Sequence, residues 1–308
     1  MSTPPNITGI SSVPPRLAQE RVDELLASVG QQVANQTFDP TQTEVFEELI
    51  ECLGDVRGMK RLRTATLLGE EIGTPSTPYL LDALENHPNV VVRRAAAKTL
   101  ALVENPEAIP TLLHALTHDD DTVVQGSVVG ALARTGAAAA PDLLKILSNV
   151  ESSETLKGHA AWALAFMGAG AESYLYDALT SDSVDVRAAV IGAIAKLVQE
   201  NPTDRAFQVL IDALGDPDAM IRCEAITALG NLAHTPALPK LVALLPHADF
   251  NTRKAAALAL MKMGDAAAIE PLKTALAEEA TVNLHPILKL AINQLTAKTA
   301  GEDDDDWD

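Results

Sequence analysis

The chain is poor in aromatic residues. Its 308 residues include 2 Trp, 3 Tyr and 5 Phe, together 3% of the sequence, whereas hydrophobic residues make up 47%. The core must therefore be built mainly from Ala, Leu, Val and Ile. Small aliphatic side chains of this kind suit helices that pack closely on one another. The composition favours an all-α protein.

Cysteine is also scarce. The two cysteines, Cys52 and Cys223, lie far apart, and neither has a second cysteine in a C-x-x-C spacing. This excludes a disulfide framework and removes the usual sequence motif for a zinc site. Both residues fall in helical patterns, where buried free thiols are expected. We predict no metal site.

Basic residues are outnumbered, with 23 Lys and Arg against 42 Asp and Glu, for a net charge of −19. A surface of this sign repels the phosphates of nucleic acids and of anionic membranes. No apolar run is long enough to span a membrane, and the polar, proline-rich N-terminus is unlike a secretory signal. We therefore expect a cytoplasmic protein that binds another protein, without nucleic-acid binding or membrane insertion.

The strongest pattern present is an internal repeat. In seven stretches a basic or polar residue, here called the anchor, is followed seven positions later by Leu or Ile, and successive anchors lie 30 to 35 residues apart. A period of this size indicates a solenoid of stacked helical repeats. The anchors are Lys60, Arg93, Gln125, Lys157, Arg187, Arg222 and Arg253.

Each repeat predicts two helices. The first begins near the anchor and has a stripe of Ala and Leu, and the second is shorter and contains a leucine trio such as Leu80, Leu81 and Leu84. Asp, Asn or Ser often stands four residues before the anchor, where these residues cap helices well. We expect the anchor arginines to form a structural ladder with turn residues of successive repeats. Its members are Arg93, Arg187, Arg222 and Arg253.

The repeats predict one continuous array with a cap at each end. The expected segments are a disordered N-terminus (1–15), two capping helices (16–54), the repeat array (55–280), a further capping helix (281–298) and an acidic disordered tail (299–308).

The turn pattern D-x-x-x-V-R, followed by x-A-A-x-A-L, stands here as NVVVRRAAAKTL, SVDVRAAVIGAI and FNTRKAAALAL. It resembles the short HEAT-like repeat of cyanobacterial phycobilisome lyases, the relatives of E/F-type bilin lyase subunits. The resemblance covers about residues 55–298 and implies a right-handed α-solenoid of about seven helix pairs with helical caps. The segments DDDTVVQGSVVGALARTG and KGHAAWALAFMGAGAE are also similar to a cyanobacterial HEAT-repeat protein that associates with an IscA-type iron–sulfur carrier.

The sequence has no HExxH, GxSxG, P-loop or GxGxxG motif in a suitable context. We therefore predict no catalytic residues and favour a non-catalytic scaffold or chaperone-like adaptor that assists cofactor or chromophore maturation. The resemblance implies an iron–sulfur carrier or a phycobiliprotein subunit as its partner, and no cofactor beyond a transiently held bilin. The alternative is a bilin lyase or lyase subunit, which attaches phycobilin to phycobiliproteins or removes it.

The fourth repeat, which reads TLKGHAAWALAFMGAGAESYLYDAL, departs most from the others. Trp162 stands where other repeats have Lys, Gly, Thr or Leu, so this position is not deep core. An exposed aromatic residue can anchor a partner, and the alternative is that Trp162 fills a gap left by neighbouring glycines. We also expect the exposed sides of the second helices to form a binding strip centred on this repeat. The candidate partner-binding residues are Trp162, Tyr174, Tyr176, Asp177 and Asp212.

Overall fold

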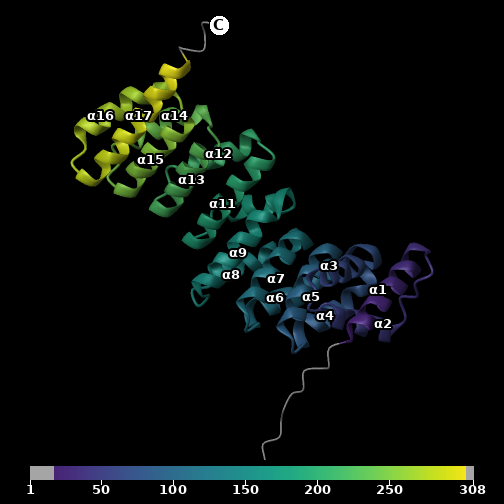
Figure 1. The fold of residues 1–308 in the computed structure, drawn as a ribbon. Coiled ribbons are helices and arrows are strands. Elements are labelled where there is room, and N and C mark those ends of the chain that lie inside the picture. Colours follow the sequence, from purple (N-terminus) through teal and green to yellow (C-terminus); the bar gives the residue numbers. More distant parts are fainter. Residues whose placement is uncertain (1–16, 303–308) are drawn as a thin grey trace, which may run out of the picture. The chain divides into compact units, whose positions relative to one another are not determined.

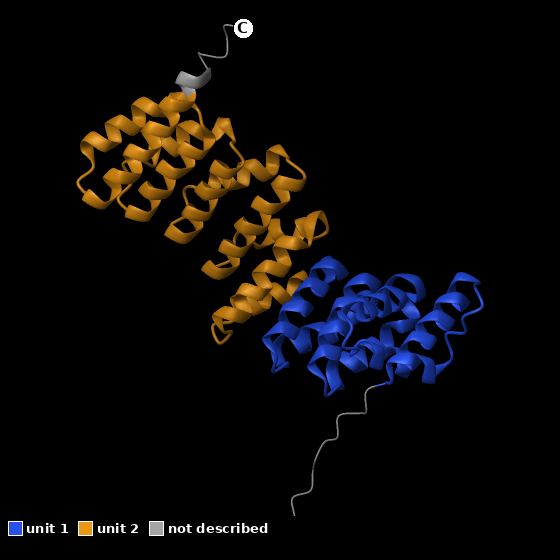
Figure 2. Cartoon of the chain, viewed as in Figure 1, with its two compact units in different colours: residues 1–139 blue, residues 140–308 orange. Residues whose placement is uncertain are grey.

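The computed structural model describes residues 17–302, which form helices and turns without a β-strand in that range (Figure 1). The chain divides into two compact units, residues 1–139 and 140–308 (Figure 2). The predicted all-α array of helix pairs is confirmed. The predicted disordered N-terminus, and residues 303–308 of the predicted acidic tail, lie outside the described residues. No helix within the described range is long and apolar enough to cross a membrane.

The helices of unit 1 are α1 (Gln19–Ala34), α2 (Thr43–Cys52), α3 (Gly58–Thr66), which continues as a π-helical segment (Leu67–Ile72), α4 (Thr77–Asn86), α5 (Val90–Val103), α6 (Ile109–His118) and α7 (Thr122–Thr135). Those of unit 2 are α8 (Ala140–Ser148), α9 (Glu154–Phe166), α10 (Glu172–Ala178), α11 (Val184–Glu200), α12 (Asp204–Ala213), α13 (Ala219–Asn231), α14 (Leu238–Ala243), α15 (Phe250–Met263), α16 (Ile269–Glu278) and α17 (His285–Glu302).

Within each unit the helices form two layers. One layer contains the anchor helices, which are α3, α5 and α7 in unit 1 and α9, α11, α13, α15 and α17 in unit 2. The other contains the second helices, most of which follow a short 3-10 turn. Pro78, Pro110 and Pro239 stand in the first turn of α4, α6 and α14, where a backbone N–H has no helical partner to lose.

The core lies between the two layers. Leu80 and Leu84 of α4 are fully buried, as are Ala96 and Ala97 of the neighbouring α5. The anchor helices also pack directly on one another, α5 on α7 and α13 on α15, whereas the second helices touch each other much less. Small side chains at the closest points make this possible, because they let two helix backbones approach.

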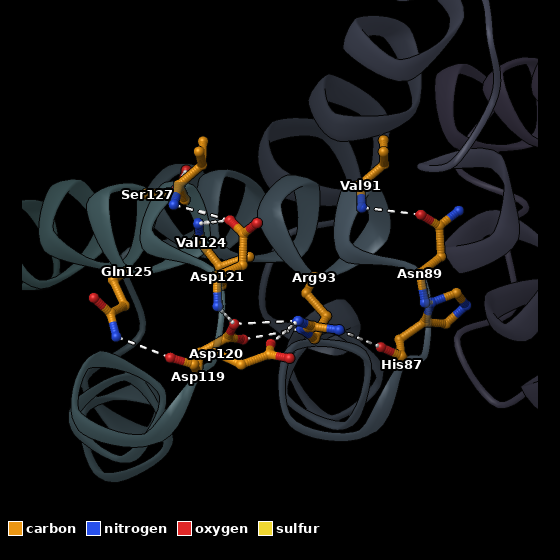
Figure 3. A network of polar contacts seen from close by, with 11 residues as sticks. His87, Asn89, Val91, Arg93, Asp119, Asp120, Asp121, Val124, Gln125 and Ser127 are labelled. Atoms are coloured by element: carbon orange, nitrogen blue, oxygen red, sulfur yellow. Dashed lines mark hydrogen bonds and ion pairs between the residues drawn. The ribbon is translucent and has the colours of Figure 1, made fainter.

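An arginine ladder ties successive turns together in unit 1 (Figure 3). The guanidinium of Arg93 donates to the carbonyl oxygen of His87 at 3.2 Å and, at 2.9 and 3.2 Å, to both carboxylate oxygens of Asp119 in the next repeat. It also donates to Asp120 at 2.7 Å. Asp119 in turn accepts the backbone N–H of Asp121 at 2.9 Å. The Arg93 side chain therefore links the turn before its own helix to the turn of the following repeat.

The same geometry recurs in unit 2. Arg187 donates to the carbonyl of Ser181 at 2.8 Å and to Asp216 at 3.2 Å. Arg253 donates to the carbonyl of His247 at 2.9 Å and to Glu279 at 2.8 and 3.1 Å.

Arg222, the fourth predicted member of the ladder, differs in its partner. It donates to the carbonyl of Asp216 at 2.7 Å and, at 3.3 Å, to the hydroxyl of Thr252. Asp119 and Asp216 stand six residues before an anchor, not four, and Glu279 stands six before His285, the equivalent position in α17. The sequence pattern did not single out these three carboxylates. The residues four before the anchor are N-caps as expected, for example Asp121, which accepts the N–H groups of Val123 and Val124.

The first anchor is Arg61 and not Lys60, so the predicted register was wrong by one residue in this repeat. Arg61 donates at 2.6 Å to the carbonyl of Asp55, six residues earlier, as Arg93 and Arg253 do in their own turns. Lys60 instead forms an ion pair with Asp23 at 2.7 Å. Two adjacent basic residues fit the sequence pattern equally well, and only the turn geometry distinguishes them.

The last rung of the ladder makes stability depend on pH. The Arg253 guanidinium, with the Thr281 N–H and hydroxyl, lowers the pKa of Glu279 from 4.5 to about 2. Because the folded pKa lies below the unfolded one, this stabilisation is fully present above pH 4.5 and is lost as the pH falls toward 2. We expect Glu279→Gln to lower the free energy of unfolding by about 1–2 kcal/mol at neutral pH.

Urea unfolding of both proteins, followed by circular dichroism between pH 7 and pH 3, measures this. The difference between wild type and Glu279→Gln should shrink as the pH falls. A difference that stays constant over this range would show that the Glu279 charge does not contribute.

Candidate functional site

The exposed face of the anchor helices carries different residues from one repeat to the next. The position five residues after the anchor lies on this face, and none of the residues that occupy it in α5 to α15 is buried. They are Lys98, Gly130, Trp162, Gly192, Thr227 and Leu258. In unit 2 this face is hollowed at two places.

The first hollow lies over α9 and α11 and has a volume of about 460 Å³. Its floor consists of alanines and the glycines Gly158 and Gly192. These glycines create the space, because a Cβ on Gly158 would meet nothing within 4 Å and one on Gly192 only Glu224 at 3.5 Å. The cation of this hollow, Lys157, is neutralised by Asp185 at 2.6 Å.

The second hollow lies over α13 and α15 and has a volume of about 690 Å³. Its apolar lining includes Met220, Ala255 and Leu258, and its only charged members are Asp218, Lys254 and Lys262. Met220, which is 52% exposed, lines both hollows. We therefore treat the two hollows as one surface and call it the anchor-face groove.

An aromatic pair stands on the same face of α9. Trp162 and Phe166 are 47% and 48% exposed, and their rings stack with centroids 4.2 Å apart. The Lys196 ammonium of α11 lies 5.4 Å from the centre of the Phe166 ring, a cation–π contact. Trp162 does not fill the space beside Gly192, since only Glu224 comes within 4 Å of that position.

The other predicted partner-binding residues lie in the layer of second helices. Tyr174 and Asp177 are exposed on α10, and Asp212 is exposed on α12, where it accepts the amide of Gln208 at 2.7 Å. Tyr176 is covered by Arg205, whose guanidinium lies 3.7 Å from the ring centre, and burial raises the pKa of its phenol.

The two layers bury their inner faces against each other, so their exposed faces look in opposite directions. The structure therefore separates Trp162 from the other four predicted residues. They belong to two alternative surfaces, and which of these binds a partner stays a prediction.

Neither cysteine is an activated thiol. Burial raises the pKa of Cys52 to about 12 and raises that of Cys223, which lines the second hollow. Both remain protonated at neutral pH, whereas a nucleophilic cysteine needs a lowered pKa. Within residues 17–302 no three metal-ligating side chains gather in a way that could hold a metal ion.

Sequence reasoning missed Met220, Lys254 and Lys262. A signal for the lysines existed, because Lys254, Leu258 and Lys262 are spaced by four residues and so share one helix face. The spacing could not show that this helix face lines an exposed hollow and is not covered by a neighbouring helix.

The paired helix layers and the ladder of turns define a HEAT-repeat protein. The sequence matches the HEAT repeats family over residues 46–133, 140–218 and 207–283. It is 34% identical to the bilin biosynthesis protein MpeU of Synechococcus sp. (strain WH8020) over 280 residues, which cover 91% of this chain and 94% of that protein. The chain belongs to the phycobilisome-lyase type of the HEAT-repeat family.

Two further proteins are similar over shorter or more divergent stretches. The phycocyanin alpha phycocyanobilin lyase CpcF of Synechocystis sp. (strain ATCC 27184 / PCC 6803 / Kazusa) is 29% identical over 178 residues, or 54% of this chain and 80% of that protein. Among solved structures, the complex of CpcE and CpcF of phycocyanin lyase from Nostoc sp. PCC7120 matches with a TM-score of 0.35 and 20% identity. That match covers 81% of this chain and 94% of the other.

These comparisons correct the function favoured from the sequence. The prediction of a non-catalytic scaffold was wrong, because the relatives are named for bilin biosynthesis and bilin lyase activity. None of these names supports the predicted iron–sulfur carrier as a partner. The error came from treating the lack of a known catalytic motif as a sign of no catalysis. Such motifs detect only chemistries with a local sequence pattern, and the repeats of this chain mainly reflect helix packing.

Proposed function

We propose that this protein is a bilin lyase or a lyase subunit, which holds a phycobilin transiently and transfers it to a cysteine of a phycobiliprotein. The observation that supports this most is the 34% identity to MpeU across 91% of the chain. The anchor-face groove agrees with it, since its lining is largely apolar and the volumes of its two hollows suit a small-molecule ligand.

The nucleophile of this transfer is the cysteine thiol of the acceptor, so this chain need only hold the bilin in position. The acceptor thiol adds to a carbon–carbon double bond of the bilin, so that a carbon–sulfur bond forms, the thiol hydrogen ends on carbon and no group leaves. Holding the bilin in one orientation against the acceptor can supply much of the acceleration of such a reaction. The protonated state of Cys223 in the groove is consistent with a residue that does not compete with the acceptor thiol.

A reconstituted transfer assay tests this proposal. The purified chain, alone and with a second HEAT-like lyase subunit, is mixed with a phycobilin and an apo-phycobiliprotein subunit. We expect a covalent adduct that survives denaturation, formed faster and at fewer cysteines than without the chain. The proposal would be contradicted if, for each phycobilin tested, both mixtures formed the adduct no faster than the same mixture without this chain.

The exposed aromatic pair is the proposed contact for the phycobiliprotein acceptor. Exposed tryptophans are frequent binding hot spots, and loss of one costs about 2 kcal/mol or more. We expect Trp162→Ala to weaken binding of the apo-phycobiliprotein at least tenfold, as measured by calorimetry or surface plasmon resonance. Tyr174→Ala, a change of similar kind in the other layer, is the matched control and should leave affinity unchanged. If Tyr174→Ala weakened binding and Trp162→Ala did not, the acceptor would bind to the second helices, near Asp177 and Asp212.

A further inference from the structure

The second hollow is lined by two lysines, Lys254 and Lys262, that have no ion pair. Lys98, Lys240 and Lys289 also lack one among the described residues, so what distinguishes Lys254 and Lys262 is their place in a largely apolar hollow. Within the described part of the chain, neither Lys254 nor Lys262 has a carboxylate oxygen within 4.0 Å. Lys262 donates only to the amide oxygen of Asn231, at 2.7 Å, across to α13.

The two lysines stand at either end of one apolar strip. Lys254, Leu258 and Lys262 follow one another at four-residue intervals along α15, and all three line the second hollow. Eight residues of α-helix span about 12 Å along the axis. Each lysine has a long flexible stem, so the two ammonium groups can reach anions whose separation is shorter than this.

The charge of this hollow is opposite to that of the chain. Its lining has two lysines against one carboxylate, Asp218, which is already engaged as the N-cap of α13 through the Met220 N–H at 2.8 Å. The first hollow, in contrast, is lined by Glu154, Asp185 and Glu224 against the single paired Lys157. The second hollow therefore favours a ligand with an apolar body and two negative groups.

We infer that the second hollow binds the propionate carboxylates of an open-chain tetrapyrrole through Lys254 and Lys262, with the apolar tetrapyrrole against Leu258 and Met220. This inference rests on the proposed function and identifies which part of the groove holds the bilin. Ammonium–carboxylate hydrogen bonds are among the stronger polar contacts, and they fix orientation as well as affinity. The first hollow and the aromatic pair then remain free for the acceptor protein.

The test compares Lys254→Gln/Lys262→Gln with a matched control, Lys240→Gln/Lys273→Gln. The control removes the same charge from the exposed second helices α14 and α16. Phycocyanobilin and its dimethyl ester, in which the propionates are neutral, serve as probes, and binding is followed by bilin absorbance. Melting curves of both variants should match wild type, because surface substitutions rarely change stability much.

We expect the groove variant to bind phycocyanobilin at least tenfold more weakly than wild type, and the control variant to bind it as wild type does. Wild type should also prefer the free acid to the ester, and the groove variant should not distinguish them. Equal binding of phycocyanobilin by the groove variant and wild type would overturn the inference. The proposed bilin lyase function would remain intact. Failure of wild type to bind the bilin would overturn the inference. Binding without transfer, both alone and with a second lyase subunit, would contradict the proposed function and leave the inference standing.

Discussion

Replacing Arg93 with alanine is expected to lower the free energy of unfolding of unit 1 by about 3 kcal/mol. The guanidinium holds Asp119, whose side chain is only 6% exposed, through two hydrogen bonds, and it also binds the His87 carbonyl. Removing it leaves a nearly buried carboxylate without its cation and a turn carbonyl without its side-chain donor. Both losses act on the junction between α5 and α7.

Urea unfolding monitored by circular dichroism measures this effect, and Arg134→Ala is the control. Arg134 also pairs with a carboxylate, Glu104, but both side chains are about half exposed. Exposed ion pairs contribute about 0–1 kcal/mol, so this variant should stay close to wild type. Equal effects of the two substitutions would mean that the ladder contributes no more than an ordinary surface pair.

Replacing Gly230 with alanine is expected to destabilise unit 2 by about 2–3 kcal/mol. A Cβ at this position would lie 2.7 Å from both the Cα and the Cβ of Ala259, so the backbones of α13 and α15 would have to move apart. Gly69 occupies the same position relative to its anchor, eight residues after Arg61, and its Cβ would lie 2.6 Å from Leu102. These glycines stand where neighbouring anchor helices approach most closely.

Gly192→Ala is the matched control, because it makes the same change in an anchor helix of the same unit. A Cβ at Gly192 meets only the Glu224 carboxylate at 3.5 Å, so the helix gains the better propensity of alanine without a clash. We expect Gly192→Ala to raise stability by up to about 1 kcal/mol. Thermal unfolding of the two variants should therefore shift Tm in opposite directions. A lower Tm for Gly192→Ala, or an unchanged Tm for Gly230→Ala, would contradict this account of the groove and the helix contact.

The resemblance to phycobilisome lyases was visible in the turn-and-alanine pattern, and the comparison with MpeU supports it. The function favoured first was nevertheless wrong, since an absent motif was given more weight than that resemblance. The candidate site was predicted only in part. Trp162 was correctly placed outside the deep core, because its position varies between repeats and the structure leaves it 47% exposed.

The sequence by itself determined the features that depend on residues close together in the chain. Helix pairs, N-caps such as Asp121 and buried leucines such as Leu80 follow from spacings of one to four residues, because a helix brings just these neighbours onto one face. The internal period then predicted that the pairs stack.

Only the tertiary structure decided which residues of different repeats meet. Arg93 reaches Asp119, 26 residues away, and not the N-cap that the spacing suggested. Cys223 and Lys254, 31 residues apart, line one hollow. The physical reason is that local periodicity shows which face of a helix is apolar. It does not show how near the next helix lies. That distance decides whether a face is buried, hydrogen-bonded to the next repeat or open to a ligand.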